Sequence, residues 1–317
     1  MASDTGEFSG KIGRVVLGAT RAEGGTRTVS YTVGGEANLP FMEGTGGSGG
    51  IPLVALEICD DPVYWSPIVN GYTGDVVHDT PAWAAEAEKK YGADLVRLYL
   101  TSTKQRGFSD FPAVKKAVEG VLSSTGLPLV VEGSNEQSID SDVFQNCGEA
   151  GEGERLLLGT AEAGRYRSVA AAAMAYHHSV IAQSPIDINL AKQLNILLHE
   201  IGVTDDHILI DPYTGTLGYG FEYSYSVMER IRYAALKGDT DLAMPMITSA
   251  TDSLTVKEVR ESEPAVREEM AVMWELYAAI SSAVAGSAIV CVRHPKTVGM
   301  LKAALREIWT GKVPVEG

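Results

Sequence analysis

RLLLGTAEAGRYRSVAAAAMAYHHSVIAQSPIDINLAKQLNILLHEIG, residues 155–202, contains the same pattern twice. Each copy begins with a short apolar run, at 155–161 and at 179–185, and continues as a helix-like segment, at 166–178 and at 188–202. Continuous apolar runs between helices are typical of parallel strands that are buried on both faces. The stretch therefore predicts two consecutive strand–helix units.

The same alternation extends in both directions along the chain. Six further apolar runs occupy 52–58, 94–100, 127–133, 207–211, 242–248 and 287–294. The helix-like segments that follow them occupy 80–93, 111–124, 140–151, 222–239, 263–286 and 295–311. Eight units within about 260 residues have the usual size of a (β/α)8 TIM barrel. A doubly wound open sheet is the alternative fold.

The residues at the ends of these segments support the division. A glycine follows a helical pattern where a left-handed C-terminal cap is favoured, at Gly92, Gly126, Gly202, Gly238, Gly286 and Gly311. Thr80 and Asp187 are predicted to be N-caps, because each precedes a helical pattern and has a side-chain oxygen that can accept from the first turn.

Residues 1–50 lie outside the repeat. The alternating runs 14–19 and 27–35 flank AEGGT at 22–26, which predicts a β-hairpin. The glycine-rich stretch 43–50 has the composition of a flexible linker. We therefore divide the chain into an N-terminal hairpin extension with its linker, 1–50, and a TIM barrel, 51–317. The hairpin is expected to plug the N-terminal end of the barrel or to lie along its side.

Composition limits the class of protein. The 317 residues are 45% hydrophobic, enough for a full core, and carry a formal net charge of −15. Such a charge argues against a nucleic-acid surface, which needs clustered Lys and Arg. There is neither an apolar run of membrane-spanning length nor a signal-peptide pattern at the start. Cys59, Cys147 and Cys291 are isolated from one another. We expect a cytoplasmic protein with reduced thiols and no membrane partner.

In a TIM barrel the functional site forms at the C-terminal ends of the strands. The predicted ends carry hydroxyls, amides and carboxylates, but no strand contains a lysine for a Schiff base, and only His294 among the histidines ends a strand. The segments after the last two strands lack the glycines of a phosphate cradle. Two interpretations remain: a methyl-transfer barrel whose Asp and Asn side chains hold a heterocycle, and a surface that caps a cofactor carried by another protein.

Several long stretches resemble the small subunit of the corrinoid iron–sulfur protein, a family that includes the delta subunit of the archaeal acetyl-CoA decarbonylase/synthase complex. The resemblance covers about residues 12 to 311, and its most specific parts are SPIDINLAKQLN (184–195) and DPYTGTLGYG (211–220). The other matching stretches are 15–36, 153–162, the remainder of 170–203 and the remainder of 208–232.

This resemblance implies a place in the reductive acetyl-CoA (Wood–Ljungdahl) pathway. The implied protein is a non-catalytic subunit of a heterodimeric methyl carrier. Its large subunit holds the [4Fe–4S] cluster and most of the cobalamin site, and the small subunit caps the cobalamin at the interface. The implied partners are that large subunit, methyltetrahydrofolate:corrinoid methyltransferase and acetyl-CoA synthase/CO dehydrogenase. The alternative is a free-standing pterin-binding methyltransferase, with Asp187, Asn189 and Asp211 holding methyltetrahydrofolate.

Seven residues at two predicted strand ends are candidate contacts to the cofactor: Ser184, Asp187, Asn189, Asp211, Thr214, Gly215 and Gly218. For Asp187 the competing role is a helix cap, and for Asp211 it is an acceptor that holds the following turn together. The glycines permit close backbone approach or simply give the loop its freedom. No catalytic residue and no metal ligand is assigned.

Overall fold

Eight parallel strands close into a barrel in the computed structural model, which describes residues 8–39, 50–133 and 135–310. The strands pair in the order β10-β3-β4-β5-β6-β7-β8-β9. Their bounds are β3 Leu53–Cys59, β4 Leu95–Tyr99, β5 Leu129–Glu132, β6 Leu157–Ala161, β7 Ser179–Gln183, β8 Ile208–Asp211, β9 Met246–Ser249 and β10 Ser287–Val292. The closed order confirms the (β/α)8 barrel and excludes the open sheet.

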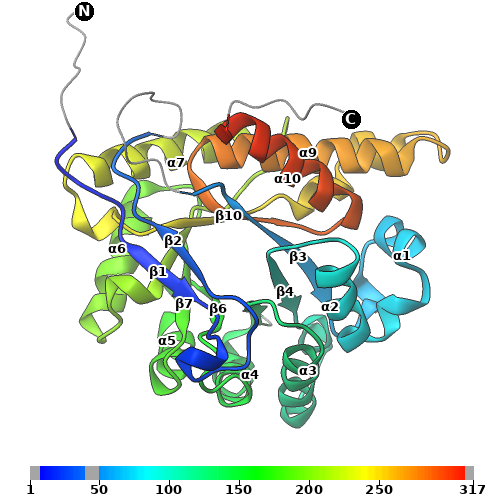
Figure 1. The fold of residues 1–317 in the computed structure, drawn as a ribbon, viewed down its shortest axis with the longest axis horizontal. Coiled ribbons are helices and arrows are strands. Elements are labelled where there is room, and N and C mark those ends of the chain that lie inside the picture. The colour runs from blue at the N-terminus through cyan, green and yellow to red at the C-terminus, as the bar shows by residue number, and fades with distance from the viewer. Residues whose placement is uncertain (1–7, 40–49, 134, 311–317) are drawn as a thin grey trace, which may run out of the picture.

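Helices surround this barrel on its outside (Figure 1). Their bounds are α1 Pro67–Thr73, α2 Thr80–Lys89, α3 Phe111–Ser124, α4 Gln137–Ala150, α5 Tyr166–Ala175, α6 Ile188–Glu200, α7 Phe221–Leu236, α8 Lys257–Glu261, α9 Arg267–Val284 and α10 Pro295–Thr310. The short helices α1 and α8 were not expected from the alternation, and both lie in connections that follow strand ends. Within the described residues, no helix is long and apolar enough to cross a membrane.

Most of the predicted helix caps are confirmed. Asp187 accepts hydrogen bonds from the backbone N–H of Asn189 and Leu190, at 2.7 and 3.1 Å. The prediction for Thr80 is wrong, because Asp79 is the N-cap of α2 and accepts from Ala82 N at 3.0 Å. The φ angles are left-handed at Gly92, Gly202, Gly238 and Gly286 but not at Gly126, and Gly311 lies outside the described residues.

Gly126 is needed for space rather than for a left-handed turn. A Cβ at this position would lie 2.3 Å from Thr28 Oγ1, in the connection between the two strands of the N-terminal hairpin. The backbone of the two segments is joined there by a hydrogen bond from Thr28 N to Gly126 O at 2.9 Å.

The N-terminal hairpin closes the N-terminal end of the barrel. Its strands β1 Arg14–Leu17 and β2 Tyr31–Gly34 pair antiparallel. One face, with Val15, Leu17 and Val33, packs on the inward-facing apolar side chains at the starts of the barrel strands. The hairpin therefore plugs the barrel, the first of the two expected positions. The predicted linker, apart from Gly50, lies outside the described residues.

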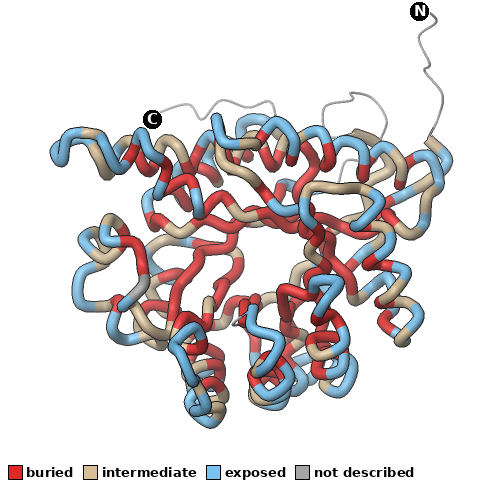
Figure 2. The backbone as a smooth tube through the Cα atoms, turned by 180° about the vertical axis from the view of Figure 1, so that it is seen from behind, coloured by how far each residue is buried: buried red, intermediate tan, exposed pale blue. Residues whose placement is uncertain are grey.

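Buried side chains form two layers on either side of the barrel wall. The larger cluster lies between the strands and the helices, and the smaller one fills the barrel interior beneath the hairpin. Figure 2 shows the buried strands at the centre and the exposed outer faces of the helices. The hairpin and its apolar layer fill the N-terminal half of the interior, so the C-terminal strand ends carry the open mouth.

Candidate functional site at the C-terminal mouth of the barrel

The inward-facing side chains change from apolar to polar toward the C-terminal strand ends. In β4, Leu95 belongs to the apolar layer, whereas Arg97, two residues later and on the same face, belongs to the polar one. The same change occurs in β3 at Glu57, in β5 at Glu132, in β7 at Gln183, in β8 at Asp211 and in β9 at Ser249. The floor of the mouth is therefore a hydrogen-bonded polar layer.

Arg97 is the centre of that layer. Its Nη1 lies 2.9 Å from Glu57 Oε2 and donates to Ser249 Oγ at 2.9 Å, and its Nη2 donates to Glu132. Because β4 and β9 are not neighbours in the barrel, the bond to Ser249 spans the interior. Burial alone lowers the pKa of Arg97, but the Glu57 carboxylate and other nearby negative groups outweigh burial and raise it. The guanidinium stays charged and paired.

Glu57 also binds a second arginine. Its Oε1 accepts from Arg293 Nε at 2.6 Å, and the Arg293 guanidinium lies 4.3 Å from the centre of the Trp65 ring. The Glu57 carboxylate is almost fully buried. One carboxylate thus links two cations at the floor of the mouth.

Asp211 ends β8 and organises the loop that follows it. Its Oδ2 accepts from Gln183 Nε2 at 2.7 Å, and its Oδ1 accepts from Tyr213 N at 2.8 Å. Burial raises the pKa of Asp211, while these two hydrogen bonds lower it in part. The geometry matches the predicted turn-holding acceptor.

The loop between β8 and α7 is held by a second set of bonds. Ser224 Oγ donates to Tyr213 O and accepts from Gly215 N, both at 2.9 Å. A Cβ on Gly215 would lie 3.0 Å from the backbone of Gly220, and Gly218 has a φ of +74°. A side chain at Gly215 would therefore meet a tight contact, and glycine is favoured at Gly218 for its conformation. The loop is therefore held in a defined conformation by its own hydrogen bonds.

The structure brings the two groups of predicted residues together. Ser184 N donates to Asp211 O at 3.0 Å, and Ile186 N donates to Pro212 O at 3.3 Å. Ser184, Asp187 and Asn189 therefore stand beside the loop that carries Thr214, Gly215 and Gly218. Asp187 is engaged as the cap of α6, and Asn189 is exposed in the first turn of that helix.

A cavity of about 390 Å³ opens beside these residues. It lies outside the ends of β6 and β7, and its walls are Glu162, Ala163, Gly164, Gln183, Ser184, Pro185, Leu190, Gln193, Leu194, Leu197 and Tyr213. Ser184 Oγ is buried there without a hydrogen-bond partner among the described residues, and so is the nearby Thr214 Oγ1. Buried polar groups are ordinarily paired, so these two hydroxyls favour a ligand or partner atom at this place.

Three exposed tyrosines lie on the loop after β8 and in the first turn of α7, and one of them, Tyr213, lines the cavity. Tyr213, Tyr219 and Tyr223 are 46%, 50% and 64% exposed. Tyr219 Oη donates to Glu258 at 3.0 Å, which fixes that ring. Phe221 is buried beneath the loop and Tyr225 packs on the core. The aromatic stretch thus divides into two packing residues and three that face outward, and aromatic side chains of the latter kind are frequent in protein interfaces.

Sequence reasoning missed Arg97, the residue that organises the floor of the mouth. The signal was present, because a single arginine interrupts the apolar run LVRLYL. A charged residue inside a strand that is buried on both faces must point into a polar interior and be paired. Glu57, Glu132 and Arg293 belong to the polar strand ends that the sequence predicts, but the sequence does not show that they form one network with Arg97.

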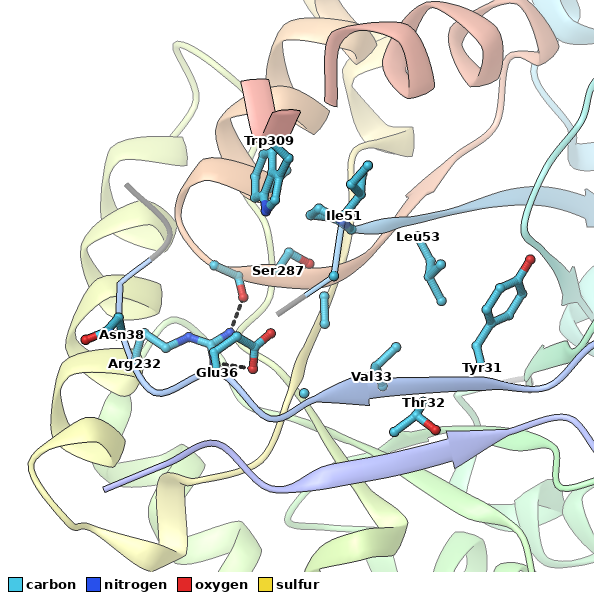
Figure 3. Close-up of a pocket in the computed structure, with 16 residues that line it drawn as sticks. Tyr31, Thr32, Val33, Glu36, Asn38, Ile51, Leu53, Arg232, Ser287 and Trp309 are labelled. Atoms are coloured by element: carbon cyan, nitrogen blue, oxygen red, sulfur yellow. Dashed lines mark hydrogen bonds and ion pairs between the residues drawn. The ribbon is translucent and has the colours of Figure 1, made fainter. Parts of the chain in front are cut away.

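A separate cavity of about 240 Å³ lies at the opposite end of the barrel (Figure 3). It is bounded by β2 of the hairpin, the starts of β3 and β10, and Trp309 near the end of α10. The buried guanidinium of Arg232 lies at the edge of this cavity, where it donates to Glu36 at 3.3 Å and to Gly286 O. This cavity is remote from the strand ends that carry the polar network.

The three cysteines are buried inside the fold. Cys59, Cys147 and Cys291 are all free thiols, and burial raises the pKa of each. A thiol must lose its proton to bind a metal or to attack an electrophile. These positions therefore act as small core side chains.

Comparison with known proteins shows which family this chain resembles. Residues 14–284 match the family described as CO dehydrogenase/acetyl-CoA synthase delta subunit. The delta subunit of the acetyl-CoA decarbonylase/synthase complex of Archaeoglobus fulgidus is 36% identical, over 97% of this chain and 70% of that protein. The corresponding subunit of Methanopyrus kandleri is 34% identical, over 96% of this chain and 77% of that protein.

Among solved structures, dihydropteroate synthases have a similar fold. The enzyme of Xanthomonas albilineans in complex with 7,8-dihydropteroate aligns with a TM-score of 0.57 at 19% identity, over 84% of this chain and 95% of that one. The enzyme of Vibrio fischeri aligns with a TM-score of 0.58 at 14% identity, over 82% and 94%. This likeness confirms the barrel fold and shows nothing further. The family match and the 36% identity together show that the chain belongs to the CO dehydrogenase/acetyl-CoA synthase delta subunit family, which is the corrinoid iron–sulfur protein small-subunit family.

Proposed function

We propose that this chain is the small subunit of a heterodimeric corrinoid iron–sulfur methyl carrier, and that its C-terminal mouth caps the cobalamin held by the large subunit. The observation that carries the proposal is the 390 Å³ cavity lined by the unpartnered hydroxyl of Ser184 and by the exposed Tyr213. The family supplies the setting, a multisubunit complex that makes or cleaves acetyl-CoA.

The residues at this face fit a corrinoid. A corrin is a broad ring with amide groups at its rim, and amides both donate and accept hydrogen bonds. Ser184 and Thr214 offer unpaired hydroxyls, and Asn189 offers an exposed amide. Tyr213 and Leu190 add exposed apolar surface beside them. When bound, the corrinoid would supply the cobalt that carries the methyl group.

The chain itself would position the corrinoid and shield it from water. The paired network of Glu57, Arg97 and Arg293 gives a rigid floor without a free acid, base or nucleophile. The loops after β7 and β8, tied together by the bond from Ser184 N to Asp211 O, would cover the ring and exclude water. The [4Fe–4S] cluster would belong to the large subunit, and methyltetrahydrofolate:corrinoid methyltransferase and acetyl-CoA synthase/CO dehydrogenase would be the partners that give and take the methyl group.

Two substitutions on one helix test the proposal. Leu190→Trp places a large ring at the cavity wall from an exposed position, whereas Ile196→Trp makes the same kind of change elsewhere on α6, outside the cavity lining. In heterodimer purified after co-expression, Leu190→Trp should lower the ratio of bound corrinoid to protein, read from the visible absorption, and slow methyl transfer. Ile196→Trp should change neither.

Equal corrinoid content and equal methyl-transfer rates in both variants would contradict the capping role. The chain expressed alone provides a second arm. Saturable binding of methyltetrahydrofolate by the isolated chain would favour the pterin methyltransferase instead.

A further inference from the structure

A second concave site lies at the other end of the barrel, between the hairpin and the starts of three strands. Its volume is about 350 Å³. Its walls come from β1, from the residues just before β6 and β8, and from the start of β7: Arg14, Val16, Arg155, His177, Ser179, Asp206 and His207. We name it the hairpin-side cavity. We propose that it binds the phosphate group of a small organic phosphate.

The side chains that line the hairpin-side cavity are mostly hydrogen-bond donors. Two arginines and two histidines line it, and Ser179 adds a hydroxyl. Two arginines in one cavity stand out in a chain whose formal net charge is −15, although Asp206 also lines the cavity and Glu23 pairs with Arg155. A phosphate group has only acceptor oxygens, and arginine is the side chain best suited to bind it.

The two arginines retain free binding capacity. The guanidinium of Arg14 has no hydrogen-bond or ion-pair partner among the described residues. Arg155 uses Nη1 to bind Glu23 at 2.9 Å, which leaves Nη2 and Nε for a ligand. Two cationic side chains with unused donors are thus placed on one concave surface.

The acidic residue of the hairpin-side cavity is already engaged. Asp206 Oδ1 accepts from Thr204 Oγ1 at 2.5 Å and lies 3.1 Å from His207 Nδ1. These contacts, that of Thr204 first, lower the pKa of Asp206. Its carboxylate therefore holds the His207 ring in place.

The backbone at this site is held in an uncommon conformation. Arg155 and His177 have φ angles of +50° and +57°, in the left-handed region that non-glycine residues rarely occupy. Both therefore stand in the cavity lining at some conformational cost. Such residues concentrate at ligand-binding and catalytic sites, where the surrounding structure holds them in place.

An adjoining cavity gives room for the organic part of the ligand. Its volume is about 250 Å³, and it shares His177 and His207 with the hairpin-side cavity. Ala173, Met174 and Val203 provide apolar wall there. An arginine-lined cavity beside an apolar one fits a phosphate ester better than inorganic phosphate.

Calorimetric titration of the full chain tests this inference with three probes: adenosine 5′-monophosphate, adenosine and inorganic phosphate. We expect the monophosphate to bind saturably and more tightly than inorganic phosphate, and adenosine to show no saturable binding. Arg14→Gln and Arg155→Gln should each raise the dissociation constant of the monophosphate by about tenfold or more, since each removes a charge-assisted hydrogen bond. Arg306→Gln, an exposed arginine on α10, is the matched control and should have no effect.

Arg14→Gln keeps the test decisive, because Arg14 is exposed and unpaired and its loss breaks no described contact. Equal affinity for adenosine and its monophosphate, unchanged affinity in both variants, or no saturable binding of either phosphate would overturn the inference. Tighter binding of inorganic phosphate than of the ester would overturn the assignment to an organic phosphate. Neither the large subunit nor the corrinoid is needed, so the result is independent of the proposed function.

Discussion

At the scale of single residues, Arg97 explains how a barrel interior accommodates charge. Its guanidinium is buried, and the two carboxylates that flank it are nearly as inaccessible. Taking three charges out of water is favourable only if the charged groups are placed so that they pair with one another. The network around Arg97 meets this condition through Glu57, Glu132 and Ser249. The mouth thereby gains a fixed floor.

Removing Arg97 should be strongly destabilising. Arg97→Met leaves the carboxylates of Glu57 and Glu132 buried with fewer partners, so we expect the free energy of unfolding to fall by about 3–5 kcal/mol. Urea unfolding of the variant and the wild type measures this difference. Lys257→Met, which removes an exposed pair with Glu261 at 3.9 Å, is the control and should cost under about 1 kcal/mol. Similar losses in the two variants would show that the network is not a stabilising unit.

Glu275 should make stability depend on pH in a defined direction. Burial raises its pKa to about 7 from the ordinary 4.5, although Thr297 Oγ1 and two backbone N–H groups donate to it. Between these values the folded protein keeps a proton that the unfolded chain releases, so stability falls as the pH rises through this window. The loss should amount to about 3 kcal/mol at neutral pH.

Glu275→Gln isolates this contribution, because glutamine does not titrate. The difference in unfolding free energy between wild type and variant, measured by urea at about pH 5 and about pH 7.5, should shift against the wild type at the higher pH. A constant difference, or a shift in favour of the wild type, would contradict the raised pKa.

Residue-level roles were only partly predictable from the sequence. Asp187 was recognisable as a cap because its signal is local, an acceptor one residue before a helical pattern. Arg97 was not recognised, because its partners come from β3, β5 and β9 and depend on barrel closure. The cap at Asp79 was missed for a different reason. Thr80, one position away, also has a side chain that suits a cap.

At the scale of elements, the hairpin β1–β2 is part of the barrel core. Val15 and Leu17 face the inward apolar layer, whereas Val16 between them is 37% exposed. The element was predictable from its alternating pattern. Its place beneath the barrel was not decided by that pattern, because an alternating strand requires an apolar surface without specifying which one.

Two valines on one strand test the plug. Val15→Ala should lower the free energy of unfolding by about 2 kcal/mol, since it removes buried carbon and leaves a cavity. Val16→Ala, the same change one residue away, should have an effect of under about 0.5 kcal/mol. Both values are measurable by urea unfolding. A small effect at both positions would mean that the hairpin contributes little to the barrel core.

Helix α6 allows a test of the capping role of Asp187. Asp187→Ala should lower the free energy of unfolding by about 1 kcal/mol because two backbone donors lose their acceptor, and Asp187→Ser should restore most of that loss. Thermal unfolding of the three proteins measures the effect. If Asp187→Ala were as stable as the wild type, the capping assignment would be wrong.

At the scale of the whole molecule, the two ends of the barrel have different characters. The C-terminal mouth has a paired ionic floor, a cavity with unpartnered hydroxyls and exposed tyrosines. The N-terminal end is closed by the hairpin and carries the arginine-lined hairpin-side cavity. Barrel class and family were predictable because eight repeated units and two long specific stretches carry them. The cavities were not, because each is lined by several segments that only the closed barrel brings together.

The central claim is that the C-terminal mouth covers a corrinoid held by another subunit, and it is tested most directly without mutation. Hydrogen–deuterium exchange of this chain would be compared alone and in complex with the corrinoid-loaded large subunit. We predict slower exchange on complex formation in 184–190 and 212–220, with 14–17 and 31–34 of the hairpin unchanged. Protection confined to the hairpin, with the two loops at the strand ends exchanging as in the free chain, would contradict the account.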